Sequence, residues 1–205
     1  MTRILFVCTG NTCRSPMAEA LFRRMAEEAG MAAEARSAGV AALDGQPISK
    51  HSKKVLEERG ITDDLQSRSL KQEDVAWADL ILTMTMHHKR IVIEEFPEAI
   101  DKVYTLKEYA SFDQEQTKAV QERESLMAKL QLQIAAGQTP DEQDMNRLLE
   151  LEGKVPNYDI IDPFGGNLTL YTNVAKEIEE QLRRVIERLR EKRAADDDPD
   201  PAAAN

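Results

Sequence analysis

The sequence predicts an α/β domain in which a parallel four-stranded sheet lies between two layers of helices. Strand patterns alternate with helix patterns along most of the chain, the order that builds parallel sheets with right-handed crossovers. The 205 residues are 41% hydrophobic, enough for one substantial core. Ligands bind such folds at the carboxyl ends of the strands, so we expect a functional site in the loops that follow them.

The elements are predicted from apolar spacing and from the residues that end each pattern. Ile4–Val7 is continuously apolar, as in a strand buried on both faces of a sheet. Apolar residues then recur at helical spacing over Pro16–Ala29, with Ser15 as the predicted N-cap and Gly30 as the stop. Further strands are predicted over 33–37, 79–84 and 102–104, and further helices over 48–59, 86–96 and from 170 onward.

A second helical pattern interrupts this series. Apolar residues at helical spacing over 119–134 stop at Gly137, and Thr139, Pro140 and Glu142 have the order of a capping box that opens another helix. The pattern predicts an αα-hairpin at about 113–155, inserted into a single domain that spans 1–195. The hairpin either packs on itself or serves as a lid or a docking arm for a protein partner. The acidic stretch 196–205 is predicted to be disordered.

Charge and cysteine content exclude several classes of function. The net charge of −10 argues against a nucleic-acid partner. No segment has the length of a membrane span and the N-terminus lacks a signal-peptide pattern, so we expect a cytoplasmic protein without a membrane partner. Two cysteines and three poorly spaced histidines predict neither a disulfide framework nor a metal site, and no cofactor is implied.

The segment Cys8–Pro16 carries the strongest indication of chemistry. It joins the first strand to the first helix, so backbone N–H groups and the positive end of the helix surround one concavity, which suits a tetrahedral dianion. Cys8 lies at its base, where this field is expected to lower the pKa of the thiol and give a thiolate at neutral pH. Arg14 can hold two phosphoryl oxygens at once, and Ser15 can donate its hydroxyl to the sulfur.

Residues 6–20, FVCTGNTCRSPMAEA, closely resemble the low-molecular-weight protein tyrosine phosphatase family, as do Arg36–Gly39 and Asp159–Pro163. The resemblance implies a doubly wound, flavodoxin-like phosphatase fold with a cysteine nucleophile in a C-x5-R-S motif. It makes Asp162 the general acid, although Asp159 would serve equally well from chemistry alone.

The same resemblance implies the substrate contacts of the site. Cys8, Arg14 and Asp162 are catalytic, and a left-handed turn at Asn11 with a hydrogen bond from Ser37 supports the loop. The implied substrate-binding residues are Thr9, Gly10, Asn11, Thr12, Cys13, Arg14, Ser15 and Phe164. The chain departs from the family at Leu65–Arg68, where a histidine often precedes the arginine.

Three features resemble the protein arginine phosphatase branch of this family: Thr12 where most members have isoleucine or leucine, the acid loop Asp162–Gly166, and the run Leu106–Tyr109. A hydroxyl makes the pocket wall polar, which suits a guanidinium leaving group better than a phenyl ring. We therefore expect hydrolysis of phosphoarginine on proteins through a phosphocysteine intermediate. A protein tyrosine phosphatase, with Thr12 as a tolerated isostere, is the enzymatic alternative, and a phosphoprotein-binding adapter is the alternative from another class.

Cys13 lies five residues after Cys8, close enough in a tight loop for a disulfide to form on oxidation. The pair is either a reversible redox switch or a nucleophile beside a small buried hydrophobe. No cysteine follows Cys13, which disfavours an arsenate reductase, because that class needs a resolving cysteine far downstream. His87 and His88 are expected at a solvated helix start, and His51 has no predicted partner.

Overall fold

The computed structural model describes residues 1–111, 114–152 and 156–197, and the chain divides into two compact units. The first unit consists of Met1–Ala110 together with the segment from Tyr158 onward, and the second is Ser111–Asn157. The hairpin predicted at about 113–155 falls within the second unit. In the part of the chain that the structure describes, no helix is long and apolar enough to cross a membrane.

The first unit is built on a sheet of four parallel strands in the order β2–β1–β3–β4. The strands are β1 (Thr2–Cys8), β2 (Ala33–Gly39), β3 (Leu80–Thr83) and β4 (Val103–Thr105). Cys8 pairs with Gly39 and Val7 pairs with Thr83, so the carboxyl ends of the three neighbouring strands lie along the same edge. The predicted parallel four-stranded sheet is confirmed.

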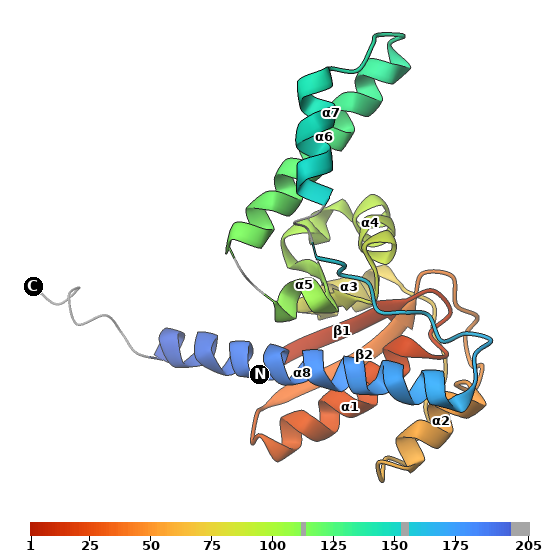
Figure 1. Ribbon diagram of the computed structural model, residues 1–205. Coiled ribbons are helices and arrows are strands. Elements are labelled where there is room, and N and C mark those ends of the chain that lie inside the picture. Colours follow the sequence, from red (N-terminus) through yellow and green to blue (C-terminus); the bar gives the residue numbers. More distant parts are fainter. Residues whose placement is uncertain (112–113, 153–155, 198–205) are drawn as a thin grey trace, which may run out of the picture. The chain divides into compact units, whose positions relative to one another are not determined.

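Helices cover both faces of this sheet (Figure 1). Alternate residues of β1 belong to different cores: Ile4 and Phe6 pack with α1, α2, α5 and α8, whereas Leu5 and Val7 pack with α3, α4 and η1. Burying each such side chain stabilises the fold by about 1.5–3 kcal/mol. The helices are α1 (Arg14–Glu28), α2 (Lys50–Glu57), α3 (Gln72–Trp77), α4 (Met86–Glu95), the 3-10 helix η1 (Pro97–Lys102), α5 (Leu106–Ala110) and α8 (Leu168–Asp197).

The start of α1 differs from the prediction. The helix begins at Arg14, and its N-cap is Cys13, whose side chain makes no capping hydrogen bond. Ser15, predicted as the N-cap, therefore lies inside the first turn, and its hydroxyl bonds to other partners. Pro16 is tolerated there because the N–H groups of the first turn have no helical acceptor in any case.

The end of α8 also differs from the prediction. The stretch 196–205 was expected to be disordered, but α8 continues to Asp197, while 198–205 lie outside the described residues. Ala194 and Ala195 precede the acidic stretch and favour the helical state. Along its length α8 contacts α1, α2 and α5, and it buries Ile178, Leu182 and Val185 completely.

The second unit is an antiparallel pair of helices, α6 (Gln114–Ala135) and α7 (Glu142–Glu152). Gly137 ends α6 with φ of +69°, and the N–H groups of Gly137 and Gln138 bond to carbonyls of the last turn. The capping box predicted at Thr139 is wrong. Asp141 caps α7 instead, because its carboxylate accepts from the N–H groups of Gln143 and Asp144.

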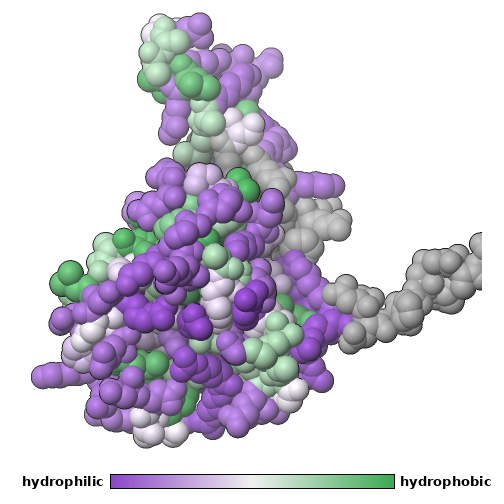
Figure 2. Space-filling model, turned by 180° about the vertical axis from the view of Figure 1, so that it is seen from behind, coloured by the Kyte–Doolittle hydropathy of each residue, from purple (hydrophilic) through white to green (hydrophobic). Residues whose placement is uncertain are grey.

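The face shown in Figure 2 is mainly hydrophilic, with hydrophobic residues scattered over the first unit and present on the second. Large exposed hydrophobic residues of the second unit include Leu132, Ile134 and Leu149. Ion pairs between Arg147 and Glu122 and between Lys129 and Asp144 join the two helices. Whether this unit docks a partner stays a prediction.

Candidate active site

The loop between β1 and α1 lies at the carboxyl edge of the sheet. Cys8 is the last residue of β1, and α1 begins only six residues later, at Arg14. Asn11 turns the chain with φ of +52°, the left-handed conformation that the family resemblance implied. Backbone N–H groups of Asn11 and Ser15 point at the Cys8 sulfur. The loop therefore directs backbone N–H groups toward the sulfur, and its role as an anion-binding nest stays a prediction.

Cys8 is surrounded by donors, yet it is buried. Ser15 Oγ lies 2.9 Å from Cys8 Sγ. Burial raises the pKa of the Cys8 thiol, whereas the hydrogen bonds from Ser15, the charge of Arg14 and the N–H of Asn11 act to lower it. The net direction is upward, which corrects the thiolate expected at neutral pH. Ionisation of Cys8 therefore depends on the donors around the sulfur.

A chain of hydrogen bonds beneath the loop fixes the direction of the Ser15 hydroxyl. Asn11 Oδ1 accepts from the backbone N–H of Arg68 at 2.8 Å. The amide nitrogen of Asn11 must then donate, and it lies 2.8 Å from the hydroxyl oxygens of both Ser15 and Ser37. Because Ser15 Oγ accepts from Asn11, its own proton is available to Cys8 Sγ.

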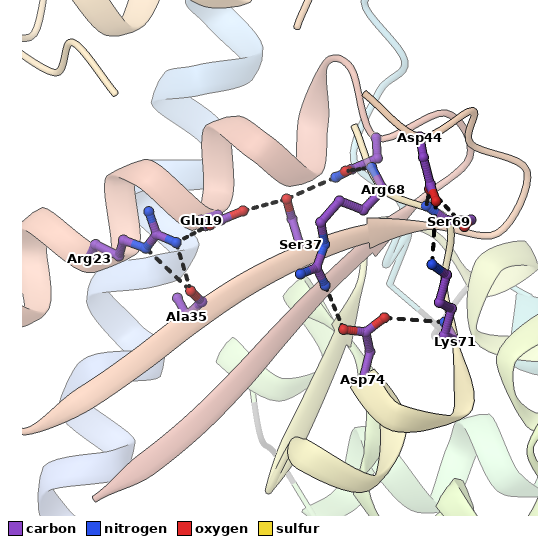
Figure 3. A network of polar contacts seen from close by, with 10 residues as sticks. Glu19, Arg23, Ala35, Ser37, Asp44, Arg68, Ser69, Lys71 and Asp74 are labelled. Carbon is purple, nitrogen blue, oxygen red and sulfur yellow. Dashed lines mark hydrogen bonds and ion pairs between the residues drawn. The ribbon is translucent and has the colours of Figure 1, made fainter. Parts of the chain in front are cut away.

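Glu19 ends this chain, and sequence reasoning missed it. Ser37 donates to Glu19, and Arg23 forms an ion pair with the same carboxylate. Burial raises the pKa of Glu19, while Ser37 and Arg23 oppose that effect. Figure 3 shows Glu19 between Ser37 and Arg23, with the Arg68 side chain turned toward Asp74. An acidic residue within the apolar start of α1 is the signal that could have identified it.

The end of β2 approaches the loop so closely that it requires glycine. A Cβ at Gly39 would lie 2.4 Å from the carbonyl oxygen of Thr9 and 2.9 Å from the backbone nitrogen of Asn11. The residues after β2 also bond to the loop, since Ala41 N–H donates to the Thr9 carbonyl at 2.9 Å. Close packing against β2 therefore holds the nest in shape.

Arg14 is buried, with 4% of its surface exposed, and its guanidinium joins α1 to the segment before α8. Nη1 donates to the carbonyl of Ile160 at 3.1 Å, and Nη2 donates to Asp162 Oδ2 at 2.8 Å. Arg14 Nε is buried and has no hydrogen-bond partner among the described residues. A buried donor of this kind needs an acceptor, and a phosphoryl oxygen would supply one.

Asp162 and Asp159, which chemistry alone did not distinguish, have different surroundings. Asp159 Oδ1 accepts from the N–H of Met86 at 2.7 Å, which ties the acid loop to the start of α4. Asp162 instead pairs with Arg14, and its side chain is 52% exposed. Asp162 is therefore positioned to exchange a proton with a ligand, and Asp159 to shape the loop.

Other contacts hold the acid loop in place. The N–H of Ile160 donates to the carbonyl of Met84 at 2.8 Å, and Lys107 Nζ donates to the carbonyl of Asp159 at 2.7 Å. Lys107 also pairs with Glu177 of α8. The run Leu106–Tyr109 thus contributes a contact to the acid loop.

These elements surround a cavity of about 250 Å³ at the carboxyl edge of the sheet. Of the predicted site residues, only Asn11 and Ser15 do not line it; both are fully buried supports of the loop. Two larger surface clefts, of about 660 and 690 Å³, are lined by mixed charges and contain none of the predicted catalytic residues. The cavity is lined by Cys8, Thr9, Gly10, Thr12, Cys13, Arg14, Asp162 and Phe164.

Comparison with known proteins identifies the family of this chain. Residues 3–123 match the model of the low molecular weight phosphotyrosine protein phosphatase family. The chain belongs to this family. It is similar to the protein-arginine-phosphatase of Geobacillus stearothermophilus, with 37% identity over 91% of this chain and 95% of that protein.

Solved structures of the family share the fold. A cysteine-to-serine mutant of the YwlE arginine phosphatase with a phosphorylated active-site serine has a TM-score of 0.70 at 34% identity, covering 94% of this chain and 99% of that one. A low molecular weight protein tyrosine phosphatase from T. tengcongensis has a TM-score of 0.68 at 33% identity, covering 92% and 99%. This phosphatase therefore resembles structures named for two different substrates at nearly the same identity.

The second cysteine of the phosphatase has a partner that the sequence did not indicate. Cys13 is 5% exposed, and its Sγ lies 3.3 Å from the hydroxyl of Tyr171 in α8. Cys8 and Cys13 are both free thiols. A disulfide between them on oxidation stays a prediction, with Tyr171 as a further contact of the resolving thiol.

The histidines correct two expectations. His88, expected at a solvated helix start, is 3% exposed and bonded through its ring, whereas His87 is exposed. His51, for which no partner was predicted, packs edge-on against Tyr171 with ring centroids 5.2 Å apart. Helical periodicity could not predict the burial of His88, because its ring contacts Thr9, which lies 79 residues away in the sequence.

Proposed function

We propose that this phosphatase hydrolyses phosphoarginine on proteins through a phosphocysteine intermediate. The nucleophile is the ionised fraction of Cys8: its thiolate Sγ, which has already lost its proton to solvent, attacks phosphorus while Arg14 and the loop N–H groups hold the equatorial oxygens. As the P–S bond forms and the P–N bond breaks, Asp162 gives its proton to the leaving guanidinium nitrogen. Asp162 then takes a proton from water, whose oxygen attacks phosphorus and releases phosphate from Cys8.

The observation that carries the choice of substrate is Thr12 in the wall of the cavity. Its carbonyl accepts from the N–H of Ser49 at 2.8 Å, which anchors the residue at the start of α2. Thr12 and Asp162 line the same cavity, so a planar group bound there meets a hydroxyl and a carboxylate. Both accept N–H hydrogen bonds, which a guanidinium can donate and a phenyl ring cannot.

Dephosphorylation of phosphotyrosine is the second candidate. Phe164 at the rim of the cavity is 80% exposed and can stack on a phenyl ring or on a guanidinium. Relatives named for tyrosine are as similar in structure as those named for arginine. Thr12 therefore supports the arginine assignment more strongly than overall similarity does.

The proposed setting is the cytoplasm, with phosphorylated proteins as substrates. Two unpaired cysteines suit a reducing compartment. We further propose that the helical unit Ser111–Asn157 is an accessory to the reaction, because every lining residue of the cavity belongs to the first unit.

Transfer of the phosphoryl group to position 8 tests the proposed reaction. A Cys8→Ser variant incubated with a phosphoarginine peptide should acquire one phosphate on Ser at that position, detected by mass spectrometry, because a phosphoserine is not readily hydrolysed. Cys8→Ala is the matched control and should stay unmodified. Unmodified Cys8→Ser, together with wild-type enzyme that releases no phosphate from the peptide, would contradict the assignment.

A further inference from the structure

His88 is a buried polar residue beside the active-site loop, and the reaction described above does not use it. It lies in the first turn of α4 and is 3% exposed. Its ring nitrogens are both bonded to threonine hydroxyls. Nε2 lies 2.8 Å from Thr9 Oγ1, and Nδ1 lies 2.8 Å from Thr85 Oγ1. A buried ring with both nitrogens bonded has one fixed orientation.

The protonation state of the ring limits how these two hydrogen bonds can be arranged. Thr85 is the N-cap of α4, and its hydroxyl oxygen accepts from the backbone N–H of His88 at 3.2 Å. Burial and the charge of Arg14 lower the pKa of His88 to about 4, so the ring is neutral at pH 7 and carries a single N–H. The Thr85 hydroxyl proton is available to Nδ1, and in that arrangement the ring proton lies on Nε2 and is donated to Thr9 Oγ1. In the other tautomer Thr9 donates to Nε2 instead, and the Thr9 hydroxyl is held by His88 in either case.

Thr9 is the first loop residue after Cys8, and it lines the cavity. Its carbonyl accepts from Ala41, which follows β2, and its hydroxyl is held by His88, which follows β3. Hydrogen bonds thus join the start of the loop to the segment after β2 and to the segment after β3, the two strands that flank β1. Backbone N–H groups stabilise an oxyanion well only when their directions are fixed beforehand.

We propose that His88 is a positioning residue of the phosphate-binding loop. By holding the Thr9 hydroxyl, it keeps the first peptide of the loop in the geometry that binds the phosphoryl group. This inference rests on the proposed phosphatase reaction, but it holds equally for a guanidinium or a phenol leaving group. His88 acts through Thr9 and needs no contact with the substrate.

Inhibition by inorganic phosphate and by orthovanadate, with p-nitrophenyl phosphate as the substrate, tests the proposal. His88→Leu and Thr9→Val should each raise both inhibition constants about tenfold, the order expected for one lost hydrogen bond to the loop. The inhibition constants of the double variant should lie within about twofold of those of the single variant that binds more weakly, because both changes remove the same contact. His88→Gln keeps a donor near the position of Nε2 and should largely restore binding. His87→Leu, at the exposed neighbour, is the matched control and should bind like wild type.

Two results would overturn the proposal. Unchanged inhibition constants in Thr9→Val would show that the contact does not matter, even if His88→Leu fails to fold. Effects that multiply in the double variant would show that His88 does not act through Thr9. Hydrolysis of p-nitrophenyl phosphate without hydrolysis of phosphoarginine would refute the substrate assignment and leave this test intact.

Discussion

The groups around Ser15 determine which atom its hydroxyl donates a hydrogen bond to. The backbone N–H of Arg68 requires Asn11 to present its amide nitrogen to Ser15, and Ser15 can then donate only onward, to Cys8. This donor opposes the burial that raises the pKa of the Cys8 thiol. One hydroxyl therefore contributes to the amount of thiolate at a given pH.

Ser15→Ala should raise the pKa of Cys8 further, because burial then acts with less opposition. We expect the pH midpoint of Cys8 alkylation by iodoacetamide to move upward by about one unit, which corresponds to one charge-assisted hydrogen bond. At a fixed neutral pH the alkylation rate should fall. Ser69→Ala, at a half-buried serine bonded to Asp44, is the control, and an unchanged midpoint in Ser15→Ala would contradict the account.

Gly39→Ala should impair the reaction without a change in any reacting group. The new Cβ would lie 2.4 Å from the Thr9 carbonyl oxygen, so the loop must move. A displacement of about 1 Å near reacting atoms can cost about a hundredfold in rate, and we expect kcat/KM to fall at least tenfold. The melting temperature separates loop displacement from unfolding; a folded variant with wild-type kcat/KM would refute the close approach.

At the scale of elements, α4 makes the free energy of unfolding depend on pH, because it carries His88, which is bonded to the active-site loop. Burial, Arg14 and His87 lower the pKa of His88 to about 4 from 6.5, against the smaller opposing effects of Asp162 and Asp159. A depressed histidine pKa means that the unfolded chain binds the proton more tightly. The contribution is fully present above pH 6.5 and is lost as the pH falls toward 4.

The free energy of unfolding should therefore drop by about 3 kcal/mol between pH 6.5 and pH 4 on account of His88 alone. Urea unfolding of wild type and of His88→Gln across this range measures the effect. The variant lacks the titrating ring, so its profile should be flatter by that amount. Parallel profiles would mean that His88 is protonated in the folded protein.

Helices and strands with a long or unbroken apolar pattern were predicted from the sequence, and the shortest helices were not. β1 was predicted because its run of apolar residues is unbroken, and α8 because its apolar stripe repeats the helical period over many residues. The short helices α3 and η1 were not predicted, since neither is long enough to repeat an apolar stripe. The start of α1 was misplaced because Ser15, a good N-cap residue, bonds to tertiary partners instead.

The site residues that are neighbours in the sequence could be predicted, and several of those that come from distant elements could not. Cys8–Ser15 is one contiguous segment, from the end of β1 to the first turn of α1, so its groups could be located from the motif. Glu19, Tyr171 and His88 reach the loop from other elements, and only the fold brings them there. The raised pKa of Cys8 was missed for the same reason, because burial is a property of the folded chain.

On the scale of the whole molecule, the chain consists of a phosphatase unit and the helical unit Ser111–Asn157. Replacing the helical unit by a short Gly-Ser linker should leave kcat/KM for p-nitrophenyl phosphate within about twofold of wild type, because the cavity and both cores of the sheet belong to the phosphatase unit. A loss greater than tenfold in a variant that still melts cooperatively would make the helical unit a functional lid.

The central claim is that Thr12 makes this enzyme an arginine phosphatase. The most direct test compares kcat/KM on matched phosphoarginine and phosphotyrosine peptides for wild type and for Thr12→Ile, with Cys8→Ser as the blank. The account predicts a strong preference for phosphoarginine in wild type and a preference reduced about tenfold or more by Thr12→Ile, the order expected when a polar contact is lost. A wild-type preference for phosphotyrosine, or a preference that Thr12→Ile leaves unchanged, would contradict it.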